Sequence, residues 1–345
     1  MEIYVLNKNF EVVDILENYE SCIWTTRFRK AGDFEIYMQA SERAINTLRE
    51  NYYLMRYDNA TVMIIKDIGI TTDIENGNYL TVTGVSLESI LAQRIVWEQT
   101  ILKSKIGTAI RKLLNENVVQ PEIQERKIDN FNIGEIDVTN KSIEMQTTGD
   151  NLEKVIQEIC VVDKLGYAVT LEEDKFMFTL KRGKDRTYNQ NENDIVIFSP
   201  DFDNLENTEY QYKSSNYKNV ALVAGEGEGK ARKTAVVGVA VGIDRYELYV
   251  DARNDSSNNG EITEDEYEQQ LKGKGEEKLG ECKKTESFTG ETLDYNFKFN
   301  VDYSLGDIVE VENEYGMTAQ AQITEIIESD DENGYSIIPT FEYQE

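Results

Sequence analysis

The stretch YYLMRYDNATVMIIKDIGITTDIENGNYLTV, residues 52–82, holds a short β-type run, a polar turn and a long β-type run. An Asn-Gly turn at 76–77 follows, and the last run opens on Tyr79. β-Branched and aromatic residues favour strands, and Asn-Gly favours a type I′ hairpin turn. The stretch therefore predicts three antiparallel strands in sequence.

A second stretch, GDIVEVENEYGMTAQAQITEIIESDDENGYSIIPTF at residues 306–341, has the same plan. Its Asn-Gly turn lies at 333–334, and Tyr335 opens its last run. Identity between the stretches is low, and any two meanders with Asn-Gly turns share these features, so duplication and coincidence both stay open. Duplication would predict two antiparallel β-barrels of one design.

The remaining patterns predict an α+β fold. A helix is expected from Ser41, and KIGTAIRKLL and DNLEKVIQEICVV, within residues 98–193, carry apolar residues at helical spacing before a hairpin. Strands return from 194, and Thr263 with Glu266 forms a capping box for a helix that interrupts them. We predict a first barrel over 1–97, an α/β domain over 98–193, a second barrel over 194–252 and 290–345, and a helical insertion over 253–289.

The composition excludes several functions. The 345 residues include 65 acidic and 36 basic ones, a formal net charge of -29, which argues against sequence-specific binding of nucleic acid and against anionic membranes. Histidine is absent, which removes Ser-His and Cys-His dyads and imidazole ligands. No long apolar run or secretion signal occurs, so no stable membrane anchoring is expected.

The cysteines Cys22, Cys160 and Cys282 lie far apart in the sequence and form no CxxC pair. An odd, scattered count predicts buried free thiols in a reducing compartment.

The loop GEGEGKARKT, residues 225–234, resembles a phosphate cradle at first sight. A Walker A loop requires glycine at 224 and a hydroxyl residue at 231, and both positions are alanine. Glu226 and Glu228 would also repel a phosphate. We expect instead a glycine-rich acidic connection between two strands of the second barrel.

The segment DSSNNGEITEDE, residues 255–266, matches a calcium loop in spacing. The matching positions are Asp255, Ser257, Asn259, Gly260, Ile262 and Glu266. A strand pattern precedes it where an EF-hand has a helix, and Glu266 already serves the capping box. We expect no metal ligand, with calcium as the open alternative.

Paired carboxylates are common in so acidic a chain. Asp201, Asp203 and Glu206 could serve a hydrolase, but we expect them to be solvated turn residues. The sequence predicts no catalytic residue, no cofactor and no enzymatic activity.

Several motifs together resemble one known family, the tail hub proteins of long-tailed phages and prophages, which are similar to the hub of the T-even baseplate. The motifs are YKNVALVAGEGEG (217–229), DRYELYVDAR (244–253), GDFEIYM (32–38), GNYLTVTGVSLESILAQRIV (77–96), SLGDIVEVENEYG (304–316), ITEI (323–326) and GYSIIPTF (334–341). One departure is Val85, where a basic residue commonly follows the glycine of the TG step.

The resemblance implies a structural protein of the virion tail, at the baseplate or tail tip, made in the cytoplasm of the bacterial host. Two tube-like barrels per chain would let a homotrimer present sixfold-like symmetry. The expected partners are the distal tail and tail tube proteins and a tip or spike protein, around a channel for DNA or the tape-measure protein.

Two alternatives belong to other classes: a tail-tip peptidoglycan hydrolase or peptidase, and a carbohydrate-binding adhesion module. Some relatives carry such modules after the hub. The sequence ends at Glu345, just beyond the last expected strand, so we expect none here.

Overall fold

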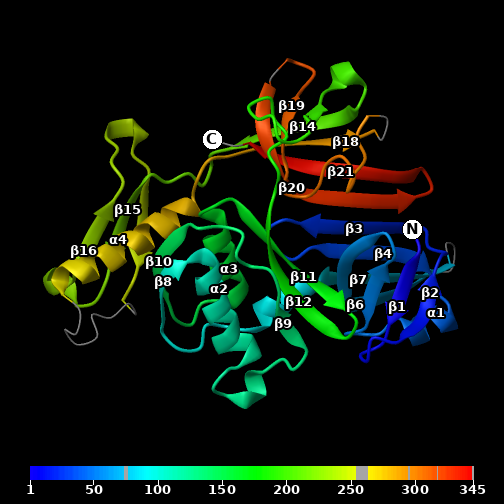
Figure 1. The fold of residues 1–345 in the computed structure, drawn as a ribbon, viewed down its shortest axis with the longest axis horizontal. Helices are drawn as coiled ribbons and strands as arrows, with labels where there is room; N and C mark the ends of the chain where they lie inside the picture. The colour runs from blue at the N-terminus through cyan, green and yellow to red at the C-terminus, as the bar shows by residue number, and fades with distance from the viewer. Residues whose placement is uncertain (74–76, 254–262, 294–295, 317, 344–345) are drawn as a thin grey trace. The chain divides into compact units, whose positions relative to one another are not determined.

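The computed structural model describes residues 1–73, 77–253, 263–293, 296–316 and 318–343 (Figure 1). The chain divides into two compact units. The first unit comprises Met1–Ile143, Thr147–Glu209 and Phe288–Glu345, and the second comprises Glu144–Gln146 and Tyr210–Ser287.

The first strand set, coloured blue to cyan in Figure 1, forms one part of a 13-stranded sheet. Alternating apolar residues of these strands bury Trp24, Phe34 and Ile36 on one face, as the period of a half-buried strand requires. The expected short helix is α1, Glu42–Thr47, and the Ser41 hydroxyl accepts a hydrogen bond from the Ala44 amide at 3.1 Å. The strands are β1 Ile3–Leu6, β2 Val12–Leu16, β3 Ser21–Arg27, β4 Asp33–Gln39, β5 Tyr53–Arg56, β6 Asn59–Asp73 and β7 Gly77–Ser86.

The second strand set belongs to the same sheet and is built around Phe198, Phe288, Tyr303 and Phe341, all buried. The Asn-Gly turn at 333–334 joins its two longest strands, and Gly334 has φ +111°, a conformation that favours glycine. The corresponding Asn76 lies outside the described residues. The elements are β13 Ile197–Phe198, the 3₁₀ helix η4 Pro200–Phe202, β14 Leu205–Lys213, β18 Thr285–Thr292, β19 Ile308–Glu312, β20 Thr318–Asp331 and β21 Gly334–Tyr343.

The two strand sets have matching neighbour orders. The first runs β3-β4-β7-β6-β5-β1, and the second runs β14-β18-β21-β20-β19-β13. The long strand of each set also shifts register at the same place, between Ile65 and Asp67 in β6 and between Ile323 and Glu325 in β20. A β-bulge interrupts a strand ladder at a defined residue, so its occurrence at the same place in both sets adds to their likeness. The sets differ at one end, where β1 is antiparallel to β5 but β13 is parallel to β19.

The segment between the strand sets contains the expected helices and hairpin. Helices α2 (Ile106–Leu114) and α3 (Leu152–Val161) bury one apolar face each, and Asn151 caps α3. Strands β11 (Leu165–Glu172) and β12 (Lys175–Arg182) form the hairpin. The other elements are the 3₁₀ helix η1 Leu87–Gln93, β8 Thr100–Lys105, the π-helix η2 Asn115–Val119, the 3₁₀ helix η3 Gln124–Arg126, β9 Phe131–Ile133 and β10 Ser142–Thr147.

The second unit has its own sheet, in the order β16-β15-β17, and its own core with helix α4. Tyr267 and Leu271 of α4 pack against Ala221 and Val223 of β15. Assigning these strands to the second barrel was therefore wrong, because they pair with one another and cover the apolar face of α4. The elements are β15 Val220–Ala224, η5 Gly229–Ala231, β16 Thr234–Val237, η6 Gly242–Asp244, β17 Glu247–Asp251 and α4 Glu264–Gly280.

Among the described residues, no helix combines the length and apolar character that crossing a membrane requires.

Candidate functional site

The edge of β3 joins the two strand sets into one sheet. β3 pairs antiparallel with β20, from Arg27 opposite Glu325 to Ser21 opposite Asp331 (Figure 1). On β20 this pairing begins beyond the bulge, after the pairing with β19 has ended at Gln322. The bulge thus marks the point at which β20 exchanges a partner of its own set for a partner of the other set.

A buried ion pair lies beside this junction. The Arg56 guanidinium of β5 is 2.9 Å from Glu328 of β20, and the Asn59 amide donates to the same carboxylate at 2.8 Å. Burial favours a lower pKa for Arg56, but its hydrogen bonds to the Asp58 and Glu328 carboxylates and their negative charges outweigh burial and hold the pKa above its usual value. The guanidinium also lies over the ring of Trp24, with 5.7 Å to the centroid.

The end of β3 is fixed by further contacts. Arg27 forms ion pairs with Asp33 of β4 and with Glu325 of β20. The amide of Phe28 then donates to the carbonyl of Thr324, the bulge residue, at 2.9 Å. The charges of the two sets therefore meet in complementary positions where the sheet passes from one set to the other.

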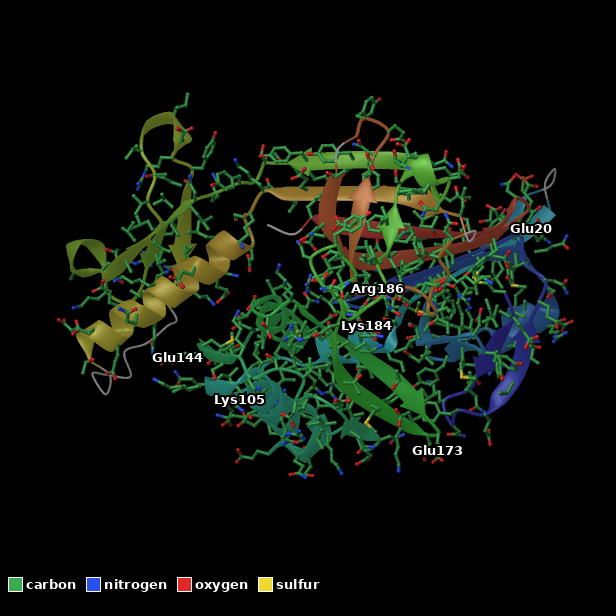
Figure 2. The ribbon with its side chains drawn as sticks, turned by 45° about the horizontal axis from the view of Figure 1, so that its top comes forward. Glu20, Lys105, Glu144, Glu173, Lys184 and Arg186 are labelled. Atoms are coloured by element: carbon green, nitrogen blue, oxygen red, sulfur yellow. The ribbon has the colours of Figure 1, made fainter. Side chains whose placement is uncertain are left out.

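A second buried ion pair ties the segment after β12 to the second strand set. Arg186 Nε lies 2.6 Å from Asp307 Oδ2, and the Lys184 amide donates to Oδ1 of the same carboxylate at 2.7 Å. Lys184 and Arg186 lie close together below the strands of that set (Figure 2). With both carboxylate oxygens engaged, Asp307 acts as a structural anchor.

The part of β6 beyond its bulge, residues 67–73, corresponds to the part of β20 beyond its bulge, which pairs with β3. β5 pairs with β6 only as far as Ile64, and beyond the bulge β6 pairs with β7 alone among the described strands. Ile68 and Ile70 are 38% and 52% exposed, whereas Ile326 and Glu328, at the matching places of β20, are 0% and 2% exposed. A surface that is buried in one set is therefore open in the other.

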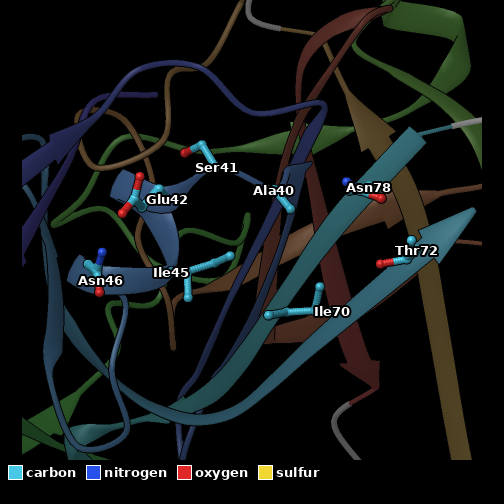
Figure 3. Close-up of a pocket in the computed structure, with 8 residues that line it drawn as sticks. All are labelled: Ala40, Ser41, Glu42, Ile45, Asn46, Ile70, Thr72 and Asn78. Atoms are coloured by element: carbon cyan, nitrogen blue, oxygen red, sulfur yellow. The ribbon is translucent and has the colours of Figure 1, made fainter.

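A hollow of about 500 Å³ lies beside this open surface. Ile70 and Thr72 of β6 line one side, and Ser41 and Ile45 at helix α1 line the other (Figure 3). Its lining mixes aliphatic and uncharged polar groups, with Glu42 at α1 as its carboxylate. The described residues that line it form no arrangement of nucleophile and base that would perform catalysis.

The Gly-Glu loop joins β15 to β16 in the second unit, not two strands of the barrel as expected. The Gly225 amide donates to the Lys233 carbonyl at 2.9 Å, and the Glu226 amide donates to the Tyr267 hydroxyl at 2.8 Å. A phosphate cradle needs such amides directed at the ligand from the start of a helix. The loop contains only the three-residue η5, so it is a structural connection.

The calcium match lies largely outside the described residues, which begin again at Thr263. There the capping box is confirmed: the Thr263 amide donates to Glu266 Oε2 at 2.8 Å, and the Glu266 amide donates to Thr263 Oγ1 at 3.3 Å. Glu266 thus has the structural role that the sequence suggested as the alternative to calcium.

The three carboxylates considered for a hydrolase are exposed around one turn. Asp201 lies in η4, Asp203 follows it with φ +51°, and Glu206 lies at the start of β14. The Ser199 hydroxyl accepts a hydrogen bond from the Asp201 amide at 3.2 Å, which is a helix cap. This arrangement fits turn residues and gives no secluded acid–base pair.

The cysteines agree in part with the expected buried thiols. Cys22 and Cys160 are buried and Cys282 is half-buried, and all are free. Burial raises the pKa of the Cys22 thiol and that of the Cys160 thiol to about 12, which keeps both protonated at neutral pH.

The sequence reasoning missed Arg56 and Glu328. Both stand at inward positions of alternating strands, where Leu54 and Ile326 precede them two residues earlier. A charge at such a position requires a partner, so the alternation itself could have identified them.

Comparison with known proteins places the chain in a family. A family model described as Siphovirus ReqiPepy6 Gp37-like protein matches residues 2–341. No curated protein matches the sequence. Among solved structures, the tail protein from Neisseria meningitidis MC58 is similar, with TM-score 0.60 and 12% identity over 99% of this chain and 96% of that chain.

Two prophage proteins have the same fold at comparable identity. The 43 kDa tail protein of prophage MuSo2 from Shewanella oneidensis has TM-score 0.58 and 11% identity, over 99% of this chain and 97% of that chain. Prophage tail protein gp18 from Listeria monocytogenes EGD-e has TM-score 0.53 and 12% identity, over 99% and 94%. With the fold of phage tail proteins and a match over nearly its whole length, the chain belongs to the family of Siphovirus ReqiPepy6 Gp37-like proteins.

Proposed function

We propose that the chain is the hub of a phage tail, a structural protein that closes the distal end of the tail tube and connects it to a tip or spike. Three copies form a ring, and each copy contributes two tube-like β-barrels. The ring then offers sixfold-like symmetry to the tail tube and threefold symmetry to a trimeric tip.

One observation carries this proposal. The two strand sets share the order β3-β4-β7-β6-β5-β1 and β14-β18-β21-β20-β19-β13, and they share the position of the bulge. They also join edge to edge through β3 and β20. A ring of three chains built from such pairs has six similar strand sets, which resolves the mismatch between a threefold and a sixfold neighbour.

The charge of the chain fits a channel through which DNA or the tape-measure protein passes. A formal charge of -29 repels phosphate groups and so limits adhesion during passage. Because a high net charge also serves solubility, the charge alone does not indicate a channel. It supports the channel only in combination with the proposed ring.

The proposed role needs no enzymatic activity. The exposed carboxylates Asp201, Asp203 and Glu206 surround a capped turn, and the described residues that line the hollow beside β6 form no catalytic arrangement. A cell-wall zymogram of the purified protein should therefore stay blank, and a glycan array should show no specific binding. Cleared bands would favour the hydrolase or peptidase, and selective glycan binding would favour the adhesion module.

Immunogold labelling of purified tails tests the position. We expect gold at the distal end of the tail, and tails assembled without the protein should lack a closed tip. Label along the tube, or tails of normal appearance in its absence, would contradict the hub.

A further inference from the structure

We propose that strand β14 of one copy pairs antiparallel with the outer part of β6, residues 67–73, in a second copy, and that this contact closes the ring. The inference rests on the proposed function, since it names the surface through which the copies of the hub associate.

The acceptor surface is defined by its counterpart within the chain. β20 beyond its bulge is covered by β3, and its inward residues Ile326 and Glu328 are buried. β6 beyond its bulge has the same place in the first set, but Ile68 and Ile70 are exposed beside an open hollow. An exposed strand edge with aliphatic side chains is a site for strand addition.

The donor is β14, because it is the counterpart of β3. β3 pairs with β4, which pairs with β7 of the first hairpin, and β14 pairs with β18, which pairs with β21 of the second hairpin. β14 also stands at one end of the sheet. A second copy of the chain therefore carries a strand, β14, that is suited to pair with residues 67–73 of β6.

The two surfaces lie at different places on the chain, so the contact is head-to-tail. Each copy offers one donor and one acceptor, and such heterologous contacts close into a ring when the rotation between copies permits it. The junction between β3 and β20 inside the chain would then alternate with the junction between β14 and β6 of neighbouring copies.

The charges at the two junctions match as well. Arg27 ends β3 and forms an ion pair with Glu325, the residue directly after the bulge of β20. Lys213 is the last residue of β14, as Arg27 is the last residue of β3, and Asp67 directly follows the bulge of β6; Lys213 and Asp67 are both exposed. The proposed contact therefore places Lys213 of one copy beside Asp67 of the next.

Charge reversal tests this pair. With association followed by light scattering and sedimentation over a range of concentrations, Asp67→Lys alone or Lys213→Asp alone should weaken self-association about five-fold or more, because like charges then meet. The double variant restores opposite charges and should return to within about two-fold of the parent protein. Lys127→Asp, an exposed reversal elsewhere, serves as control and should leave association unchanged.

A photo-cross-link locates the contact directly. Benzoylphenylalanine in place of Ile70 should join two chains on irradiation, with the adduct mapped by mass spectrometry to residues 205–213. The same probe at Ile15 is the matched control and should give no such adduct. Ile15 is exposed in β2, which lies at the opposite end of the strand order from β14.

Three results would overturn the pairing: a double variant as weak as the single ones, adducts from Ile70 to β6 or elsewhere, or a parent protein that neither associates nor cross-links. The hub role is judged separately by the gold label. Distal label with adducts elsewhere leaves the hub and removes this contact, whereas adducts on β14 without distal label keep the contact and remove the hub.

Discussion

Arg56 of β5 and Glu328 of β20 form a buried ion pair across the two strand sets, with 2.9 Å between Nη2 and Oε1. Replacing Arg56 by Met should lower the free energy of unfolding by about 3–5 kcal/mol, because the Glu328 carboxylate stays buried without its cation. Chemical denaturation followed by tryptophan fluorescence measures the change, since Trp24 lies beside Arg56.

Two further variants separate the pair from general damage. Arg56→Met combined with Glu328→Met should recover much of the loss, because no unpaired charge remains. Lys127→Ala removes a surface ion pair with Asp129, whose side chains are 40% and 83% exposed, and should cost no more than about 1 kcal/mol. A loss below about 1 kcal/mol for Arg56→Met would contradict the structural importance of the pair.

Glu88 predicts a dependence of stability on pH. Burial raises the pKa of this carboxyl, while hydrogen bonds from Ser86 and the Val169 amide and the charge of Lys181 act in the opposite direction. In the unfolded chain Glu88 ionises at the ordinary pKa, before it does so in the folded protein. Its contribution to stability is therefore present below that ordinary pKa and is lost as the pH rises toward the folded value.

Glu88→Gln should consequently stabilise the protein more at pH 8 than at pH 5, relative to the parent. The amide keeps an acceptor for the Val169 amide, which donates to Glu88 Oε1 at 3.0 Å, and it does not titrate. Urea denaturation of both proteins at the two pH values gives the difference. Because the chain has no histidine, few other groups titrate in this interval. A difference that is constant with pH would show that Glu88 titrates normally.

Local patterns in the sequence predicted the elements but not their partners. Ser41, Asn151 and Thr263 cap helices near the places where the periodicity begins, since caps and helical spacing act within a few residues. The strand patterns of β15 to β17 were equally clear, yet their assignment to the second barrel was wrong. Alternation states that one face of a strand is buried and does not state which sheet buries it.

The junction between β3 and β20 could not be predicted from local patterns, because it is made by residues far apart in the chain. The repeat of two meanders was visible in residues 52–82 and 306–341, but the pairing of β3 with β20 was not, because strand neighbours are decided by the packing of whole sets. The exposure of Ile68 and Ile70 likewise became informative only by comparison with Ile326, which is buried at the matching position of β20. Asn76 and most of the calcium segment lie outside the described residues, so those expectations stay predictions.

Gly84 of β7 provides a test of close packing in the first strand set. A Cβ at this position would lie 2.0 Å from the Ile64 carbonyl oxygen and 2.7 Å from the Phe34 ring. Gly84→Ala should therefore destabilise the protein by about 1–3 kcal/mol or more, since the backbone of β6 would have to move. Gly69→Ala is the matched control in the neighbouring strand, where the nearest atom is 3.9 Å away. Thermal unfolding should show a clear loss for the first variant and little change, or a slight gain, for the second.

Tyr267 of α4 should control the opening of the Gly-Glu loop. Its hydroxyl accepts the hydrogen bond of the Glu226 amide at 2.8 Å, and a Cβ at Gly225 would lie 2.4 Å from the same oxygen. Tyr267→Phe removes the acceptor and keeps the ring in the apolar core, so the amide loses a bond worth about 1 kcal/mol. Hydrogen exchange at Glu226 should then accelerate about five-fold while the strands of the second unit keep their protection. Tyr249→Phe, which loses only the hydrogen bond from Arg232 at 2.9 Å, is the control. If both variants exchange at the parent rate, the loop is held by its bonds to Lys233, and the tyrosine merely fills space.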